Sequence, residues 1–201
     1  MAVISNGTTL IDNGALDAAV PTGSLILLST QTASASATIS FTSGIDSTYD
    51  SYVFKFYDIH PATDGADFTF NLSVDGGSNY NVTKTTTQFN SRHSEDDSTS
   101  ALSYITGNDL AQGTGFQGIA DGVGSSADES AVGTLNLYNP SSTTFVKHFI
   151  SNFNNYRTND NTYNVFSAGY ANTTSAVNAV QFKMSGGNID SGVIKLYGIG
   201  G

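Results

Sequence analysis

The sequence predicts an all-β protein: an antiparallel β-sandwich of jelly-roll type with an extended N-terminal arm. Apolar and polar residues alternate with a period of two in many segments of the 201-residue chain, and that period indicates half-buried strands. Turn residues separate these segments at short intervals, and helical periodicity is scarce. Short strands with frequent turns are typical of antiparallel sandwiches.

The first 23 residues differ from the rest and are predicted to form the arm. Turn signals recur at Asn6-Gly7, Asn13-Gly14 and Pro21. The apolar residues are scattered and are candidate assembly contacts: Ile4, Leu10, Ile11 and Leu16. An arm laid over another surface explains this pattern, and simple disorder is the alternative.

Alternation then predicts the strands in the first half of the body, residues 24–201. The expected strands are Ser24–Thr30, Ala37–Thr42, Ser51–His60, Ala66–Val74 and Tyr80–Phe89. The fourth is the clearest, with one apolar face made of Phe68, Phe70, Leu72 and Val74. The stretch "DGGSNY" at Asp75–Tyr80 is expected to be a hairpin connection, because glycine supplies positive φ.

Between residues 90 and 130 the alternation breaks down. The stretch "SRHSEDDSTSALSY" is polar and acidic, and "GTGFQGIADGVGSSADES" is rich in glycine. We expect a long irregular insertion here, with a short helix around Ser98–Tyr104 as one option. Long loops within a compact domain are usually functional, so Phe116 and Ile119 are further candidate assembly contacts.

Strand patterns resume after residue 130. The expected strands are Val132–Tyr138, Thr143–Ser151, Thr162–Tyr170, Val177–Met184 and Gly192–Gly198. Asn139–Ser142 is expected to connect the first two tightly. The last strand, "GVIKLYG", is expected to lie between earlier strands, as the final strand of a Greek-key sandwich often does.

Four lysines lie in the middle of predicted strands, between larger apolar neighbours: Lys55, Lys147, Lys183 and Lys195. Because side chains alternate across a strand, each is expected to point away from the buried face. A lysine that faces solvent also discourages edge-to-edge aggregation. The lysines therefore indicate architecture and do not form a basic binding stripe.

Composition restricts the class of protein. Only 12% of residues are charged and the net charge is −10, which argues against a nucleic-acid partner. Cysteine is absent, so disulfides and thiolate chemistry are excluded, as fits folding in a reducing cytoplasm. The N-terminus has no basic leader, and "LILLS" at Leu25–Ser29 is too short to span a membrane, so we expect a soluble protein without a membrane partner.

The three histidines do not predict catalysis. His60 precedes Pro61 at a strand end, where a turn role is expected. His93 is adjacent to Ser94 in sequence, which does not make a triad. His148 alternates with Val146 and Ile150 and is expected on the more buried face. Motifs of the GxSxG, HExxH and GxxxxGK[ST] types are absent, so we predict a non-enzymatic protein without a cofactor or a metal site.

Three weaker alternatives stay open. A pair of loop carboxylates would be needed for glycoside hydrolysis. Calcium prefers loop oxygens, which two acidic runs offer: Glu95, Asp96 and Asp97, and Asp128 and Glu129. Aromatic side chains near predicted turns would stack on sugar rings: Tyr80, Phe116, Tyr156 and Tyr163.

Three stretches together resemble a family of virion structural proteins from tailed phages, especially marine and cyanobacterial ones. They are "FTSGIDSTYDSYVFKFYDIHPATDG" at Phe41–Gly65, "GTLNLYNPSSTTFVKHFIS" at Gly133–Ser151 and "NTTSAVNAVQFKMSGGNIDSGVIKLYGI" at Asn172–Ile199. The shared features are a Tyr-rich strand after "IDSTY" and a closing "G.I.LYG" strand. The resemblance extends over about residues 23–199.

The resemblance implies a β-sandwich on a phage particle that has folded in the host bacterial cytoplasm. We expect a capsid decoration (cement) protein that binds other virion proteins and forms a homo-oligomer, with a trimer suited to sites where three capsomers meet. The alternative is a tail- or fibre-associated module that binds a host surface glycan. The resemblance supplies no catalytic residues, and an enzyme that degrades host polysaccharide is the third hypothesis.

Overall fold

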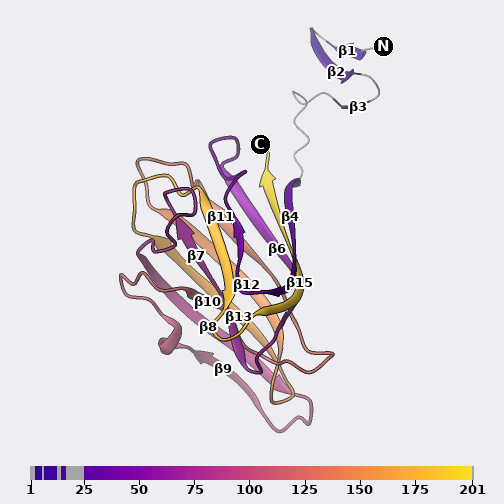
Figure 1. Cartoon of the computed structure of the whole chain (residues 1–201), viewed down its shortest axis with the longest axis vertical. Helices are drawn as coiled ribbons and strands as arrows, with labels where there is room; N and C mark the ends of the chain where they lie inside the picture. Colours follow the sequence, from indigo (N-terminus) through magenta and orange to yellow (C-terminus); the bar gives the residue numbers. More distant parts are fainter. Residues whose placement is uncertain (1–2, 6, 13–14, 17–24, 201) are drawn as a thin grey trace.

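The computed structural model describes residues 3–5, 7–12, 15–16 and 25–200 (Figure 1). Within these ranges the regular structure is β, apart from the single 3₁₀ turn η1 (Thr106–Asn108). A small antiparallel sheet near the N-terminus contains β1 (Val3–Ser5), β2 (Thr8–Asp12) and β3 (Ala15–Leu16). The prediction of an all-β antiparallel protein is therefore confirmed.

The remaining strands form one 12-stranded antiparallel sheet. Their bounds are β4 Leu25–Ser36, β5 Ile39–Phe41, β6 Ser51–Pro61, β7 Ala66–Ser73, β8 Lys84–Ser94, β9 Ser100–Tyr104, β10 Gln117–Val123, β11 Ala131–Tyr138, β12 Lys147–Arg157, β13 Asn161–Ala171, β14 Ala179–Met184 and β15 Ile189–Ile199. Each strand that alternation predicts corresponds to one of these strands. The bounds differ most for β4 and β12, which continue six residues beyond their expected ends.

The sheet bends until it nearly closes on itself as a barrel (Figure 1). Its main path runs β4-β15-β6-β11-β12-β10-β7-β14-β5, and β13, β8 and β9 extend from β12 as a branch. The junction between β12 and β10 is a single residue pair, Val123 with Arg157. The two ends of the path, β4 and β5, are consecutive in sequence.

Aromatic rings fill the space that the curved sheet encloses. Phe56 on β6 lies with its ring centroid 4.8 Å from Phe153 on β12, 5.5 Å from Phe68 on β7 and 5.1 Å from Phe182 on β14. All four rings are buried. Such offset and edge-on ring pairs add about 0.5–1.5 kcal/mol each beyond the burial of their area, so this cluster joins opposite walls of the sheet.

The last strand lies between two earlier strands, as the sequence predicts. β15 pairs with β4 along one edge and with β6 along the other. Ile194 and Leu196 are fully buried, while Lys195 between them is only partly buried. The C-terminal strand is therefore an interior strand of the sheet.

The expectation of a long irregular insertion at residues 90–130 is wrong for three parts of that segment, which are strands. β8 continues to Ser94, β9 occupies the proposed short helix, and β10 lies in the glycine-rich part. The apolar alternation is missing because β8 turns polar side chains inward: Gln88, Asn90 and Ser94 are buried. A strand whose inner face is polar gives no hydrophobic period.

The orientation of β12 also differs from the prediction. Phe149 and Phe153 face inward, so Lys147 is fully buried on the same face, while His148 and Ile150 are exposed. Lys147 donates through Nζ to the carbonyls of Phe145 (2.9 Å) and Thr173 (3.1 Å). These bonds satisfy the ammonium at the end of the core. The other three mid-strand lysines are partly exposed, as expected.

The segment Asp75–Tyr80 is not a hairpin connection, because β7 pairs with β10 and β14 and β8 pairs with β13 and β9. The Asp75 carboxylate organises this loop instead. It accepts hydrogen bonds from Ser73 Oγ (2.6 Å), Asn79 N (2.9 Å) and Asn79 Nδ2 (2.7 Å). These bonds, with Ser73 first, lower the pKa of Asp75 to about 2. The connection from Asn139, by contrast, does join the paired strands β11 and β12.

Lys84 is a second buried lysine, and its burial should make the free energy of unfolding depend on pH. Its Nζ donates to Asn71 Oδ1 (2.5 Å) and to the Val82 carbonyl (2.8 Å). Burial lowers the pKa of Lys84 to about 8. Above that pH the folded chain has lost a proton that the unfolded chain keeps until its higher pKa, so the free energy of unfolding is expected to rise with pH.

The expected rise is at most about 3 kcal/mol, and it begins at about pH 8. Denaturant titrations between about pH 7.5 and 9.5 measure it below the range in which tyrosines ionise. The variant Lys84→Met, which has no titrating group there, should show a flatter profile. Parallel profiles for the two proteins would contradict the assignment.

Candidate functional site

The main concentration of polar groups lies where two hairpin tips meet at one end of the sheet. The turn between β8 and β9 lies beside the turn between β12 and β13, because β8 and β12 both pair with β13 along its whole length. The backbone N–H of Glu95 donates to the Asp160 carbonyl across the two turns (2.9 Å). The sequence gives no signal for this meeting.

Two adjoining hollows open at these tips. One has a volume of about 370 Å³ and is lined by His93, Ser94, Glu95, Asn154, Tyr156 and Thr162. The other has a volume of about 320 Å³ and includes Asp96, Ser98, Asn159 and Asp160. Both hollows share Ser94 and Glu95, which places polar and acidic groups along a single rim.

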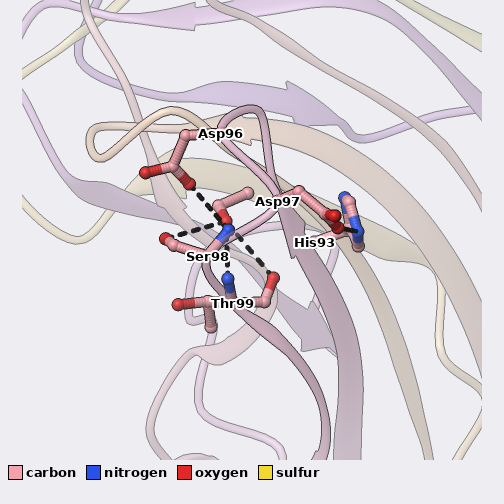
Figure 2. Close-up of polar contacts among 6 residues, drawn as sticks. His93, Asp96, Asp97, Ser98 and Thr99 are labelled. Carbon is pink, nitrogen blue, oxygen red and sulfur yellow. Dashed lines mark hydrogen bonds and ion pairs between the residues drawn. The ribbon is translucent and has the colours of Figure 1, made fainter.

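The first acidic run, residues 95–97, folds as a tight turn held by side chains of the turn itself (Figure 2). Thr99 N donates to Ser94 Oγ (2.8 Å), and Ser94 N donates to the Thr99 carbonyl (2.9 Å). Asp97 occupies the left-handed region with φ of 59°, which aspartate tolerates better than most residues. Ser98 N donates to Asp96 Oδ1 (3.0 Å), so the aspartates build the turn.

Hydrogen bonds and neighbouring charges set the protonation of this rim. The bonds from Ser98 lower the pKa of Asp96 to about 2. A hydrogen bond to Glu95 is the largest cause that raises the pKa of Tyr156 to about 12, and burial and the charge of Asp160 add to it. The Tyr156 hydroxyl donates to Asp160 Oδ1 (3.3 Å). The rim therefore presents the ionised carboxylate of Asp96 and the neutral phenol of Tyr156.

At this rim the imidazole of His93 contacts a carboxylate. Its Nε2 lies 3.1 Å from Asp97 Oδ1, and both side chains are largely exposed. Among the described residues there is no group of three or more His, Cys, Asp or Glu side chains that could hold a metal ion.

Beneath the rim, the chain's two arginines converge on one tyrosine. Arg92 Nη1 and Arg157 Nη1 each donate to Tyr163 Oη at 2.9 Å, and the Arg157 guanidinium lies 4.8 Å from the Tyr163 ring centroid. Arg157 Nη2 also lies 4.0 Å from Asp121 Oδ1. The sequence could not reveal this cluster, because it arises from the register that aligns Arg92 with Tyr163.

The second acidic run lies elsewhere, beside a hollow of about 560 Å³ that also includes Asp58 and Asp190. Glu129 is buried, and its carboxylate accepts from Ser126 N (2.5 Å). The Glu129 carbonyl accepts from His60 Nδ1 (2.7 Å). His60 lies within β6 rather than in the turn that the sequence predicts for it, and its bond to Glu129 ties β6 to this loop.

The aromatic residues proposed for sugar stacking do not form one surface. Tyr163 is buried beneath the arginines. Lys183 Nζ lies over the Phe116 ring at 4.2 Å. Tyr80 lies over Gly77 in the loop after β7, and Tyr156 alone borders the rim at the hairpin tips.

The candidate assembly contacts fall into different environments. Ile4 and Ile11 are exposed on the N-terminal sheet, while the side chains of Leu10 and Leu16 lie outside the described part of the structure. Phe116 is partly buried. Ile119 is fully buried on β10, so its proposal as a surface contact is wrong: alternation on β10 turns it into the core.

No helix among the described residues has the length and apolar character needed to cross a membrane. No protein-family model, no curated protein and no solved structure matches this chain.

Proposed function

We propose that this protein is a non-enzymatic structural protein of a tailed-phage particle that decorates and stabilises the capsid. In this proposal the nearly closed sheet is a sandwich of jelly-roll type, and the N-terminal sheet is an arm that binds a neighbouring virion protein. The protein folds in the host bacterial cytoplasm before it joins the particle. The sequence resemblance given above supports the class of protein.

The observation that carries the proposal is the N-terminal sheet. It shares no strand pairing with the main sheet in the described ranges, and the side chains of Val3, Ile4 and Ile11 on it are exposed. A sheet this small is marginal in water unless one face is covered. A surface on another molecule would cover these side chains, and adhesion by many copies would strengthen the shell by avidity.

Removal of residues 1–23 is expected to abolish binding to particles assembled without this protein, while the melting transition of the body is retained. The body keeps its whole 12-stranded sheet in this truncation, because all of its strands follow the arm. Co-sedimentation measures binding, and immunogold labelling of bound particles shows whether the protein covers heads or only tails.

The double variant Ile4→Ser and Ile11→Ser keeps the full length of the arm and changes only two of its apolar side chains, so it is the matched control for the truncation. It should weaken binding at least tenfold, on the basis of about 1.5–3 kcal/mol for each apolar side chain that becomes buried. Undiminished binding by the truncated protein would refute the role of the arm. Labelling confined to tails would favour the tail-associated alternative.

A further inference from the structure

The branch of the main sheet has an outer face that is unusually apolar. This outer face is the side of β8, β9, β11, β12 and β13 that points away from the core. Large apolar side chains on it are exposed: Phe89 (42%), Leu102 (75%), Tyr104 (60%), Tyr138 (39%), Ile150 (49%) and Phe166 (38%). At about 200 Å² for a fully exposed large side chain, they present roughly 600 Å² of accessible surface.

These side chains form a ridge beside a groove. Strand register aligns Tyr104 with Phe89 and Phe89 with Phe166, and the two phenylalanine rings stack at 5.0 Å with an angle of 11°. Ala168 lies two residues after Phe166 on β13. Its small side chain leaves a groove of about 500 Å³, which Ile150 and Tyr170 border among others. One face thus contains a protruding element and a hollow next to each other.

The outward side chains of these five strands include no carboxylate, ammonium or guanidinium group. Carboxylates from the adjoining connections, Asp97, Asp109 and Asp160, bond to His93, Tyr104 and Tyr156 on this face. Alternation places Thr85, Thr87, Phe89, Ser91 and His93 outward on β8. The outward residues of the neighbouring strands are Thr162, Asn164, Phe166, Ala168 and Tyr170 on β13, His148, Ile150, Asn152, Asn154 and Tyr156 on β12, and Val132, Thr134, Asn136 and Tyr138 on β11. For a chain with a net charge of −10, five neighbouring strands with no outward Asp, Glu, Lys or Arg are a distinct feature.

We propose that this outer face packs against the outer face of a second copy of the chain. Two acidic molecules repel each other unless their charges stay away from the seam, and a neutral face meets that requirement. An isologous contact uses one patch twice, so the ridge of each copy enters the groove of the other. The exposed area of about 600 Å² approaches the roughly 800 Å² per partner of a standard interface.

The edge strand β9 belongs to this contact as well. It pairs only with β8 among the described strands, and its sequence, Ser100–Tyr104, contains neither a charged residue nor proline. Edge strands normally carry such residues because they prevent pairing with other chains. A second copy that covers Leu102 and Tyr104 explains why β9 lacks charged residues and proline. The proposal does not depend on the phage assignment.

The test compares the mass of the full chain in solution with that of two variants. Light scattering after size-exclusion chromatography is expected to give the intact protein at least twice the 21.0 kDa of one chain. The double variant Leu102→Lys and Ile150→Lys places charges on the outer face at exposed positions and should give the mass of one chain. The matched control Val74→Lys changes a similarly exposed side chain beyond the end of β7 and should keep the mass of the intact protein.

Near-ultraviolet circular dichroism verifies that all three proteins are folded. An intact protein that stays at the mass of one chain at concentrations well above micromolar overturns the proposal. An oligomer that survives both lysines on the outer face also overturns it, as does one that the control substitution dissociates equally. If the monomeric protein instead binds a neutral glycan through this face, a ligand occupies the place assigned to the second copy, and the proposal is wrong.

Discussion

A chain that ends at Gly192 is expected to yield no cooperatively folded protein. The truncation removes most of β15, which lies between β4 and β6. Ile194 and Leu196 account for about 1.5–3 kcal/mol each when buried, a large part of the 5–15 kcal/mol that stabilises a domain. β6 would also lose its pairing with β15 at Phe54 and Phe56.

The consequence for β4 is as large as the loss of burial. Among the described strands, β4 pairs with β15 alone, so the truncation leaves residues 25–32 of β4 without a partner. A chain that ends at Ile199 is the matched control, because it removes two glycines and no strand residue. The measurement is soluble yield together with thermal melting. A soluble truncated protein with a sharp melting transition would show that β15 is not an essential interior strand.

The strands that the sequence predicts well are those with one apolar face. Phe68, Phe70 and Leu72 on β7 are all fully buried, and their alternation is visible without any structure. The alternate residues Thr69 and Asn71 are buried too, because β7 lies inside the molecule and both of its faces are covered. Alternation therefore locates a strand but does not show whether its polar face meets water.

The strands that the sequence predicts poorly are ambiguous for identifiable reasons. On β12 both faces carry apolar residues, since Phe149 alternates with Ile150, and only the fit against Phe56 and Phe70 decides which face turns inward. On β8 the inner face is polar, so it produces no hydrophobic signal. Whether a strand pairs with its neighbour in sequence depends on the whole sheet. The turn residues after β7 therefore predict a hairpin connection where the structure has a crossover.

The candidate site could not be predicted for the same reason. Glu95 and Asp160 are far apart in sequence, and they meet because β8, β13 and β12 are aligned side by side. The sequence did single out the acidic run 95–97 and Tyr156 separately. Their proximity is a property of strand order, which residue type and spacing do not encode.

The substitution Phe182→Ala is expected to lower the free energy of unfolding by about 3–5 kcal/mol. The Phe182 ring on β14 contacts rings from three other strands: Phe41 (6.2 Å), Phe54 (5.2 Å), Phe56 (5.1 Å) and Phe68 (5.8 Å). Alanine would leave a cavity among these rings, because each of them is held by its own strand and cannot collapse far.

Chemical denaturation of the two proteins at one pH measures this loss. The control Phe166→Ala removes a ring that is stacked on Phe89 but partly exposed on the outer face, so it should cost the isolated chain about 1 kcal/mol. The contrast matters because the wall that contains β14 pairs with β12 through one described residue pair, Val123 with Arg157. If Phe182→Ala were no more costly than Phe166→Ala, the aromatic cluster would not be what joins the opposite walls of the sheet, and the near-closure of the barrel would have to rest on the backbone pairing alone.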